Sequence, residues 1–117
     1  MFLEGKKALV TGSRRGIGKS IAELFAAEGA DVGINDIERD QNAEDTMDMV
    51  RDEGRRVSWH LADIADSKQV NGMFDEFLAE HGRIDILVNN AVAGRDGSFL
   101  DISEEDWDFV VGNALKG

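Results

Sequence analysis

Apolar residues follow two different spacings along this chain. Four short runs are apolar or alternate in polarity, as buried strands do. They lie at residues 7–11, 31–35, 56–61 and 84–89. In the segments between and after these runs, apolar residues recur every three or four positions, which is the period of an amphipathic helix. These segments are residues 16–28, 40–53, 67–81 and 103–114.

The helical period also predicts which side chains face the sheet. A glycine follows each of the first three segments and predicts where each helix ends. The inward positions expected in the four segments are Ile17, Ile21, Leu24 and Phe25; then Ala43, Met47 and Val50; then Val70, Met73, Phe74, Phe77 and Leu78; and last Trp107, Val110, Val111 and Ala114. Ser103 and the acidic residues after it are typical of a helix start.

Strands and helices that alternate through short connections are typical of βαβ units. Such units build a parallel sheet with helices on both faces. We therefore expect an α/β fold with a doubly wound parallel sheet, in a single domain over residues 1–117.

Composition excludes several classes of function. The chain has 24 acidic against 13 basic residues, a net charge of −11, and this balance disfavours nucleic acid as a partner. No segment is long and apolar enough for a membrane span or a signal peptide, so no membrane partner is expected. The absence of cysteine excludes disulfides and thiolate metal sites and fits a reducing compartment. We expect a cytoplasmic protein without a metal site.

Three glycines mark the first connection between a strand and a helix. Gly12, Gly16 and Gly18 lie between the run at 7–11 and the helix that follows. Backbone amides at a helix start carry partial positive charge, and glycine lets a phosphate approach them closely. A tight turn that needs glycine for its own geometry is the alternative. The position between strand and helix favours a dinucleotide site.

The spacing of these glycines belongs to a known pattern. The segment TGSRRGIG at residues 11–18 fits T-G-x-x-x-G-I-G, which resembles the short-chain dehydrogenase/reductase family. Three further motifs follow in the family's order: LADIAD with Asp63, VNNAVAG with Asn89 and Asn90, and WD…LKG near the end. The resemblance covers essentially the whole chain. It implies a Rossmann-like sheet of order 3-2-1-4, truncated after about four strands and the start of the family's fifth helix.

The glycine turn and the resemblance together point to a set of cofactor-binding residues. Asp63 is expected to contact the adenine, with capping of the next turn as the alternative. By resemblance, one residue of the Asn89–Asn90 pair supports the sheet and the other lies near the cofactor, and we expect Asn90 at a ribose. The full set is Gly12, Ser13, Arg15, Gly16, Ile17, Gly18, Asp36, Ile37, Ala62, Asp63, Ile64, Asn90, Ala91 and Val92.

Two features disagree about which dinucleotide binds. Asp36 ends the second strand, where a carboxylate accepts both ribose hydroxyls and repels a 2′-phosphate. Arg15 stands where NADP-dependent family members often carry a basic residue, and Arg39 could also pair with a 2′-phosphate. Because Asp36 would touch the ribose directly, we expect NAD, with NADP as the alternative.

The catalytic apparatus of the family is missing from these residues. The resemblance implies a serine, a Tyr-x-x-x-Lys pair and an asparagine in the fifth helix, but the chain contains no tyrosine. The family asparagine aligns with Ala114, so Asn113 is displaced by one residue, about 100° around a helix. Val92 stands where the family has glycine. His60 and His81 are poor substitutes and are expected to be structural or solvated.

These observations leave three hypotheses. The first is the amino-terminal part of an NAD(P)-dependent oxidoreductase that transfers hydride between nicotinamide and an alcohol or carbonyl substrate. The carboxy-terminal catalytic part is then absent, and this chain alone neither catalyses nor holds the small-molecule substrate. The alternatives are a stand-alone dinucleotide-binding module and a non-catalytic interaction remnant. The run at 84–89 would be an unprotected edge, so we expect a homo-oligomer formed through this strand or the fifth helix.

Overall fold

A single parallel sheet forms the centre of the molecule. The computed structural model describes residues 1–91. The four strands of this part are β1 (Lys7–Val10), β2 (Asp31–Asp36), β3 (Val57–Leu61) and β4 (Ile86–Val88). They lie in the order β3-β2-β1-β4, and every pair is parallel. This confirms the expected Rossmann-like α/β fold and its strand order.

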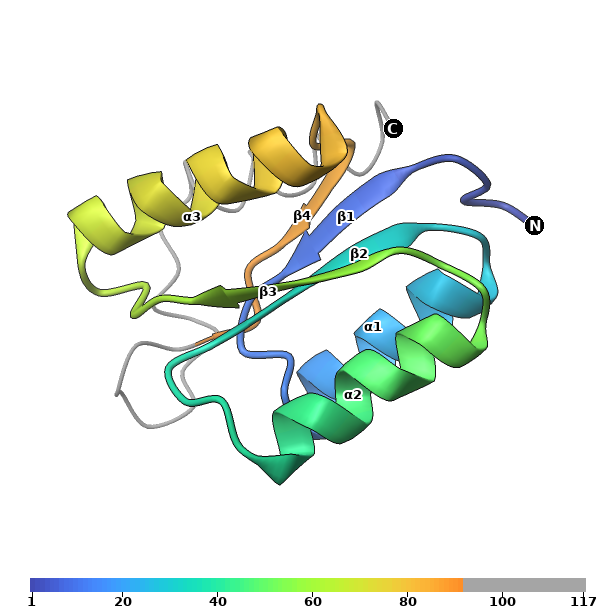
Figure 1. The fold of residues 1–117 in the computed structure, drawn as a ribbon, viewed down its shortest axis with the longest axis horizontal. Coiled ribbons are helices and arrows are strands. Elements are labelled where there is room, and N and C mark those ends of the chain that lie inside the picture. Colours follow the sequence, from blue (N-terminus) through green and yellow to red (C-terminus); the bar gives the residue numbers. More distant parts are fainter. Residues whose placement is uncertain (92–117) are drawn as a thin grey trace.

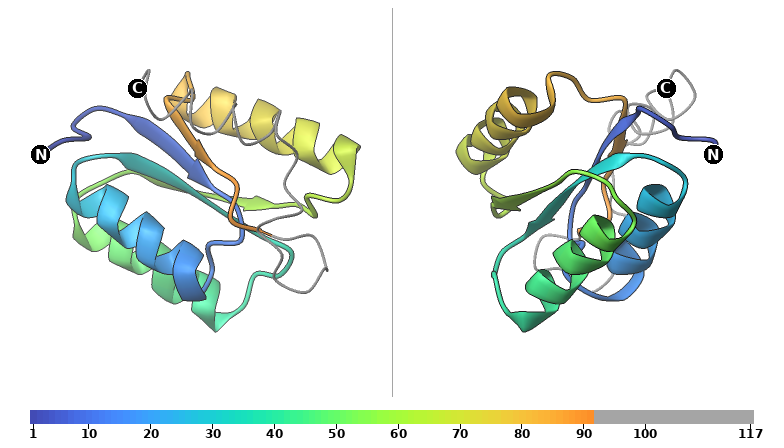
Figure 2. Two further views of the ribbon diagram at one scale, coloured as in Figure 1. Left: turned by 180° about the vertical axis from the view of Figure 1, so that it is seen from behind. Right: turned by 45° about the vertical axis from the view of Figure 1, so that its right-hand side comes forward.

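Helices cover both faces of the sheet. The helices are α1 (Gly16–Ala27), α2 (Gln41–Asp52) and α3 (Ser67–His81), within a residue or two of the predicted bounds. In Figures 1 and 2, α1 and α2 lie side by side on one face, and α3 lies on the other. The helix expected at residues 103–114 lies outside the described residues.

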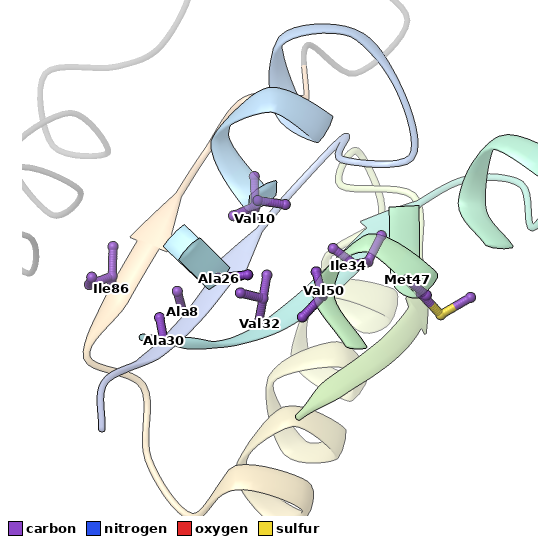
Figure 3. Close-up of a cluster of buried hydrophobic side chains, with 10 residues drawn as sticks. Ala8, Val10, Ala26, Ala30, Val32, Ile34, Met47, Val50 and Ile86 are labelled. Carbon is purple, nitrogen blue, oxygen red and sulfur yellow. The ribbon is translucent and has the colours of Figure 1, made fainter. Parts of the chain in front are cut away.

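The core under α1 and α2 is built from small and branched side chains. Figure 3 shows Ala26 of α1 lying over Ala8 of β1 and Val32 of β2, with Val50 and Met47 of α2 nearby. Alanine lets the helix approach the sheet closely, and these buried side chains form one continuous cluster. Ala43, Met47 and Val50 are buried as predicted.

The inward face of α1 differs from the prediction. Ala22 and Ala26 are buried, whereas Ile17 is 73% exposed and Leu24 is 57% exposed. The apolar stripe of this helix is wider than the contact with the sheet, and the small residues take the closest positions. The prediction for Ile17 and Leu24 was therefore wrong, while Ile21 and Phe25 pack at the margin of the core.

The core under α3 depends on one close approach. Phe77 is fully buried, and a Cβ on Gly33 of β2 would lie 2.7 Å from its ring. Met73 is buried beside it and Phe74 packs against the same cluster, as predicted. Leu78 is 44% exposed, which corrects its predicted inward position. The buried residue in the last turn of α3 is His81.

Candidate functional site

The carboxyl ends of all four strands meet at one edge of the sheet. Because the strands are parallel, the connections after Val10, Asp36, Leu61 and Val88 leave the sheet on the same side. Ligands of open α/β sheets bind in this position. The described part of the predicted site therefore lies in four neighbouring connections, brought together from segments up to 80 residues apart along the chain.

The connection between β1 and α1 is shaped by glycine. Gly12 and Gly16 have φ angles of +61° and +64°, a region that side-chain-bearing residues rarely adopt. A Cβ on Gly18 would lie 2.3 Å from the carbonyl oxygen of Gly12 and 2.8 Å from Cα of Ser13. The first turn of α1 therefore packs directly against the loop that precedes it, and only glycine permits that contact.

The start of α1 differs from the starts of the other two helices. Asp40 caps α2 by accepting from the N–H of Ala43, and Asp66 caps α3 by accepting from the N–H groups of Lys68 and Gln69. Within residues 1–91, Arg15 at the start of α1 makes no side-chain cap. The first amides of α1 are thus left for an anion, and the helix dipole favours one there.

Asn35 fixes the glycine loop to the sheet. Its carbonyl oxygen accepts from the N–H of Ser13 at 2.8 Å, and its side-chain Oδ1 accepts from the N–H of Gly12 at 3.3 Å. Its Nδ2 donates to the carbonyl oxygens of His60 and Ala62. One buried side chain therefore ties the ends of β1, β2 and β3 together. Sequence reasoning missed this role, although a lone asparagine in an apolar strand is a usable signal.

The glycine loop is also tied to the end of β4. Nδ2 of Asn90 donates to the carbonyl oxygen of Gly12 at 3.1 Å. The hydroxyl of Thr11 accepts from the N–H groups of Asn90 and Ala91, at 2.9 and 3.1 Å. The amide of Asn90 thus supports the loop, and contact of this residue with a ribose stays a prediction. Val92 and Asn113 lie outside the described residues.

Arg14 and Asp36 form the centre of a charged cluster beside the loop. Nε of Arg14 lies 3.4 Å from Oδ2 of Asp36, and Oδ1 of Asp36 accepts from the N–H of Ile37 at 2.8 Å. The guanidinium also pairs with Glu38, at 3.2 Å, and with Asp40. The hydroxyl of Thr46 on α2 donates to the carbonyl oxygen of Arg14. Arg14 thus holds the connection from β2 to α2 against the glycine loop.

The two neighbouring arginines have opposite surroundings. Arg14 is only 7% exposed and meets three carboxylates, whereas Arg15 is exposed. The hydrogen bond from Ala43 and the guanidinium of Arg14 hold the pKa of the Asp40 carboxyl below its usual value, although desolvation opposes them. Sequence reasoning assigned a role to Arg15 and missed Arg14, because the pattern RR does not show which side chain turns inward.

The remaining predicted residues surround this edge of the sheet. Oδ1 of Asp63 accepts from the N–H of Ala65 at 2.9 Å, which is the turn-capping role given as its alternative. Its contact with adenine stays a prediction. Ala62 is buried, whereas Ile17 and Ile37 are exposed near the loop. Ser13 is buried, and its hydroxyl donates to the carbonyl oxygen of Val10. Ile64 is partly exposed.

Both histidines are buried rather than solvated. His60 of β3 is 2% exposed and His81 of α3 is 8% exposed, and Nε2 of each lies within hydrogen-bond distance of Oγ of Ser58. Burial lowers the pKa of both imidazoles, although Glu76 acts in the opposite direction on His60. Within residues 1–91, no group of three side chains is placed to hold a metal ion, and no helix is long and apolar enough to cross a membrane.

Comparisons with known proteins show which family the chain belongs to. The family model of the short chain dehydrogenases matches residues 6–117. The chain is 43% identical over 117 residues to (2S)-[(R)-hydroxy(phenyl)methyl]succinyl-CoA dehydrogenase subunit BbsD of Thauera aromatica, covering 100% of this chain and 47% of that protein. It is 41% identical over 114 residues to the 3-oxoacyl-[acyl-carrier-protein] reductase of Chlamydia muridarum, covering 97% and 46%.

Two solved dehydrogenase structures superpose on this chain. A short chain dehydrogenase from Burkholderia cenocepacia, crystallised in complex with NADP, superposes with a TM-score of 0.77 at 40% identity and covers 95% of this chain and 45% of that one. Carveol dehydrogenase from Mycobacterium avium, in complex with NAD, gives 0.75 at 30% identity, with coverage of 94% and 44%.

The fold and these matches define a Rossmann-like α/β protein. The chain belongs to the short-chain dehydrogenase family. It spans about half the length of the curated relatives it matches.

Proposed function

We propose that this chain binds NAD at the carboxyl edge of the sheet. The uncapped start of α1 is the observation that carries the proposal, because it leaves backbone donors and the positive end of the helix dipole for a pyrophosphate. Gly16 and Gly18 keep side chains away from this position. In this proposal, Asp36 accepts from the hydroxyls of the adenosine ribose, and Asp63 accepts from the adenine amino group.

The charge beside Asp36 supports NAD over NADP. Asp36, Glu38 and Asp40 surround the single guanidinium of Arg14, so the cluster keeps an excess of negative charge. A 2′-phosphate would meet this excess, and like charges at such a contact cost several kcal/mol. The exposed side chain of Arg15 favours NADP as the second candidate, since it could turn toward a 2′-phosphate.

In the wider proposal, these residues form the cofactor-binding part of an NAD(P)-dependent oxidoreductase. The bound nicotinamide supplies hydride transfer to a carbonyl, or from an alcohol. This chain's residues hold the adenosine half: the glycine loop binds, Asn35 and Asn90 keep the loop in place, and Asp36 selects the ribose. The 117 residues contain no tyrosine for the family's Tyr-x-x-x-Lys pair, so we propose that this chain alone binds the cofactor without catalysing hydride transfer.

We also propose a cytoplasmic protein that associates through the end of its sheet. In the described residues, β4 pairs with β1 on one side only, and Leu87 and Val88 lie on this short strand. An apolar strand with an unpaired edge favours pairing with another strand. A second copy of the chain, or the part of the family fold that follows β4, would supply it.

Thermal unfolding with each cofactor tests the binding proposal. A ligand that binds only the folded chain raises its unfolding midpoint, so NAD at millimolar concentration is expected to raise it more than NADP does. A cooperative transition that neither cofactor moves would contradict binding. A larger rise with NADP would support the second candidate and the role of Arg15. The exposed Arg51→Gln variant, on α2, is the control for nonspecific charge effects.

A further inference from the structure

Four polar side chains form a connected cluster that the cofactor site does not use. Ser58 and His60 project from β3 toward α3, which carries Glu76 and His81. Oγ of Ser58 lies 2.6 Å from Nε2 of His60 and 2.8 Å from Nε2 of His81. Nδ1 of His60 lies 3.2 Å from Oε1 of Glu76. A hydroxyl, an imidazole and a carboxylate are thus in hydrogen-bond contact in series.

The hydrogen-bond partners determine the direction of this series. The Glu76 carboxylate accepts, so Nδ1 of His60 carries a proton and its Nε2 is the acceptor for the Ser58 hydroxyl. Ser58 has one proton to donate, so Nε2 of His81 donates to Ser58 Oγ and Nδ1 of His81 carries no proton. Within residues 1–91, the buried Nδ1 of His81 has no hydrogen-bond partner. The direction from Ser58 through His60 to Glu76 is that of a nucleophilic triad.

Burial keeps His60 in the state that a general base requires. The ring is 2% exposed, and desolvation lowers the pKa of the imidazole, so His60 is neutral at neutral pH. Glu76 opposes this shift and stabilises the imidazolium that forms when a proton arrives from Ser58. His60 can therefore accept a proton from Ser58 and return it.

The cluster opens into a cavity at the free edge of β3. The cavity has a volume of about 420 Å³ and is lined by Ser58, Trp59, His60 and Glu76, with Glu80 and Arg39 among the other residues around it. This volume fits a small organic ligand. Ser58 is partly exposed and is one of the residues that line this cavity.

The free edge also supplies a backbone donor. The carbonyl of Arg56 accepts from Val32, and the N–H of Ala62 donates to Asp36, so alternate residues of this strand face β2. Residues 56, 58, 60 and 62 therefore have their backbone groups toward β2. Trp59 falls in the other set, so its N–H points away from β2, toward the open edge of the sheet. The N–H of the residue after a nucleophile is a recurrent oxyanion donor. In the proposal, this N–H is the donor for the oxyanion of the tetrahedral intermediate that forms when Ser58 attacks an ester.

From these contacts we propose that Ser58 is a nucleophile for acyl transfer from small esters, with His60 as its general base and Glu76 as the residue that positions His60. The nucleotide site uses the glycine loop and the residues after β3, whereas Ser58 lies opposite Gly33 within the sheet. The proposal therefore does not depend on cofactor binding.

The proposed step balances without a redox partner. The Ser58 O–H bond breaks, its oxygen bonds to the acyl carbon, and the proton moves to Nε2 of His60. The bond from the acyl carbon to the leaving oxygen breaks, and His60 gives its proton to the departing alcohol. Water then attacks the acyl-serine, His60 takes a proton from that water, and Ser58 recovers it as the free acid leaves.

A fluorophosphonate probe and p-nitrophenyl acetate test the proposal on the 117-residue chain. The fluorophosphonate is expected to form one stable adduct, which peptide mass spectrometry locates on Ser58. With p-nitrophenyl acetate, a burst of p-nitrophenol is expected as Ser58 is acetylated. Ser58→Ala is expected to lose both the adduct and the burst. Ser67→Ala, at an exposed position, is the matched control and is expected to keep both.

A second pair of variants tests the role of Glu76 without disturbing the core. Glu76 is 63% exposed and Glu80 is 48% exposed, and only Glu76 contacts His60. Glu76→Gln is expected to slow acylation of Ser58 by about tenfold or more, and to move its pH profile to lower pH, because the carboxylate raises the pKa of His60. Glu80→Gln is expected to leave the acylation rate within about twofold of the unchanged chain.

Two results would overturn the proposal. The first is labelling confined to lysines or the amino terminus, with none on Ser58. The second is acylation of Ser58 at an equal rate in the unchanged chain and in Glu76→Gln, since the carboxylate would then have no role. Should Ser58→Ala fail to unfold cooperatively, the adduct position and the Glu76→Gln rate decide the question by themselves.

Discussion

Arg14 donates its backbone N–H to Oδ2 of Asp36 at 3.4 Å, and its guanidinium Nε lies 3.4 Å from the same oxygen. The residue that shapes the glycine loop therefore also orients the carboxylate that faces the ribose in our proposal. Because Arg14 reaches Glu38 and Asp40 as well, the two connections that would hold the adenosine half form one charged unit.

Replacement of Asp36 is expected to change the choice of cofactor. In Asp36→Ser, the ribose hydroxyls lose a charged acceptor and a 2′-phosphate loses a repelling charge. NAD is expected to bind about tenfold more weakly and NADP about tenfold more tightly, since each change corresponds to about 1.4 kcal/mol. Titration calorimetry with both cofactors measures this. Glu38→Gln, which removes a charge that is 65% exposed, is expected to keep the preference for NAD.

The two arginines are expected to differ in their effect on stability. Arg14→Met leaves three carboxylates without their shared partner and is expected to lower the free energy of unfolding by about 2 kcal/mol. Arg15→Met changes an exposed side chain and is expected to stay within about 0.5 kcal/mol. Urea unfolding of both variants gives the comparison. An equal loss of unfolding free energy in the two variants would show that the buried cluster around Arg14 adds no stability beyond that of an exposed arginine.

Two glycine-to-alanine substitutions are expected to act in opposite directions. The Cβ in Gly18→Ala would lie 2.3 Å from the Gly12 carbonyl oxygen, so the loop must move, stability falls and cofactor binding is lost. The new Cβ in Gly72→Ala, inside α3, meets no atom of residues 1–91 within 4 Å, and this variant is expected to gain about 0.5–1 kcal/mol from the better helix propensity of alanine. Thermal unfolding with and without NAD separates the two effects. If NAD still raises the unfolding midpoint of Gly18→Ala, the close contact between Gly18 and the Gly12 carbonyl oxygen is not needed for cofactor binding.

The buried histidines are expected to make stability depend on pH near neutrality. Both pKa values are lowered on folding, so between these values and about 6.5 the unfolded chain binds more protons. Stability is then full above about pH 6.5 and falls as the pH drops through the lowered pKa values. Charged groups that influence the pair are Glu76 and Glu80 of α3, Asp31 of β2 and Lys7 of β1.

Urea unfolding between about pH 5 and about pH 7.5 measures this dependence. His81→Gln removes one of the two titrations and is expected to flatten the slope. The pKa values of the Asp31, Asp66 and Asp85 carboxyls are also lowered, and the stability that they contribute is lost only as the pH falls toward and below about 3.8. The loss of stability caused by the histidines therefore occurs at higher pH than the loss caused by these carboxyls. A flat profile above about pH 5 would contradict the buried neutral state of the histidines.

Local patterns determined the elements and their order. The apolar runs and the helical periods predicted β1 to β4 and α1 to α3 within a few residues. Gly12, Gly16 and Gly18 marked the proposed nucleotide site because a positive φ or a close approach leaves few other residue types. Parallel strands then bring their carboxyl ends together whatever the side chains are, so the position of the site followed from the strand and helix pattern.

Tertiary contacts decided what pattern could not. Helical period allowed Ile17 and Leu24 to face inward, but contact with the sheet required the smaller Ala22 and Ala26. The RR pair did not show that Arg14 turns inward, because its partners come from the connection after β2. Ser58, His60, Glu76 and His81 are ordinary residues along the chain, and only the packing of α3 on β3 joins them. Period and motif are properties of short segments, whereas burial and hydrogen-bond partners arise between segments.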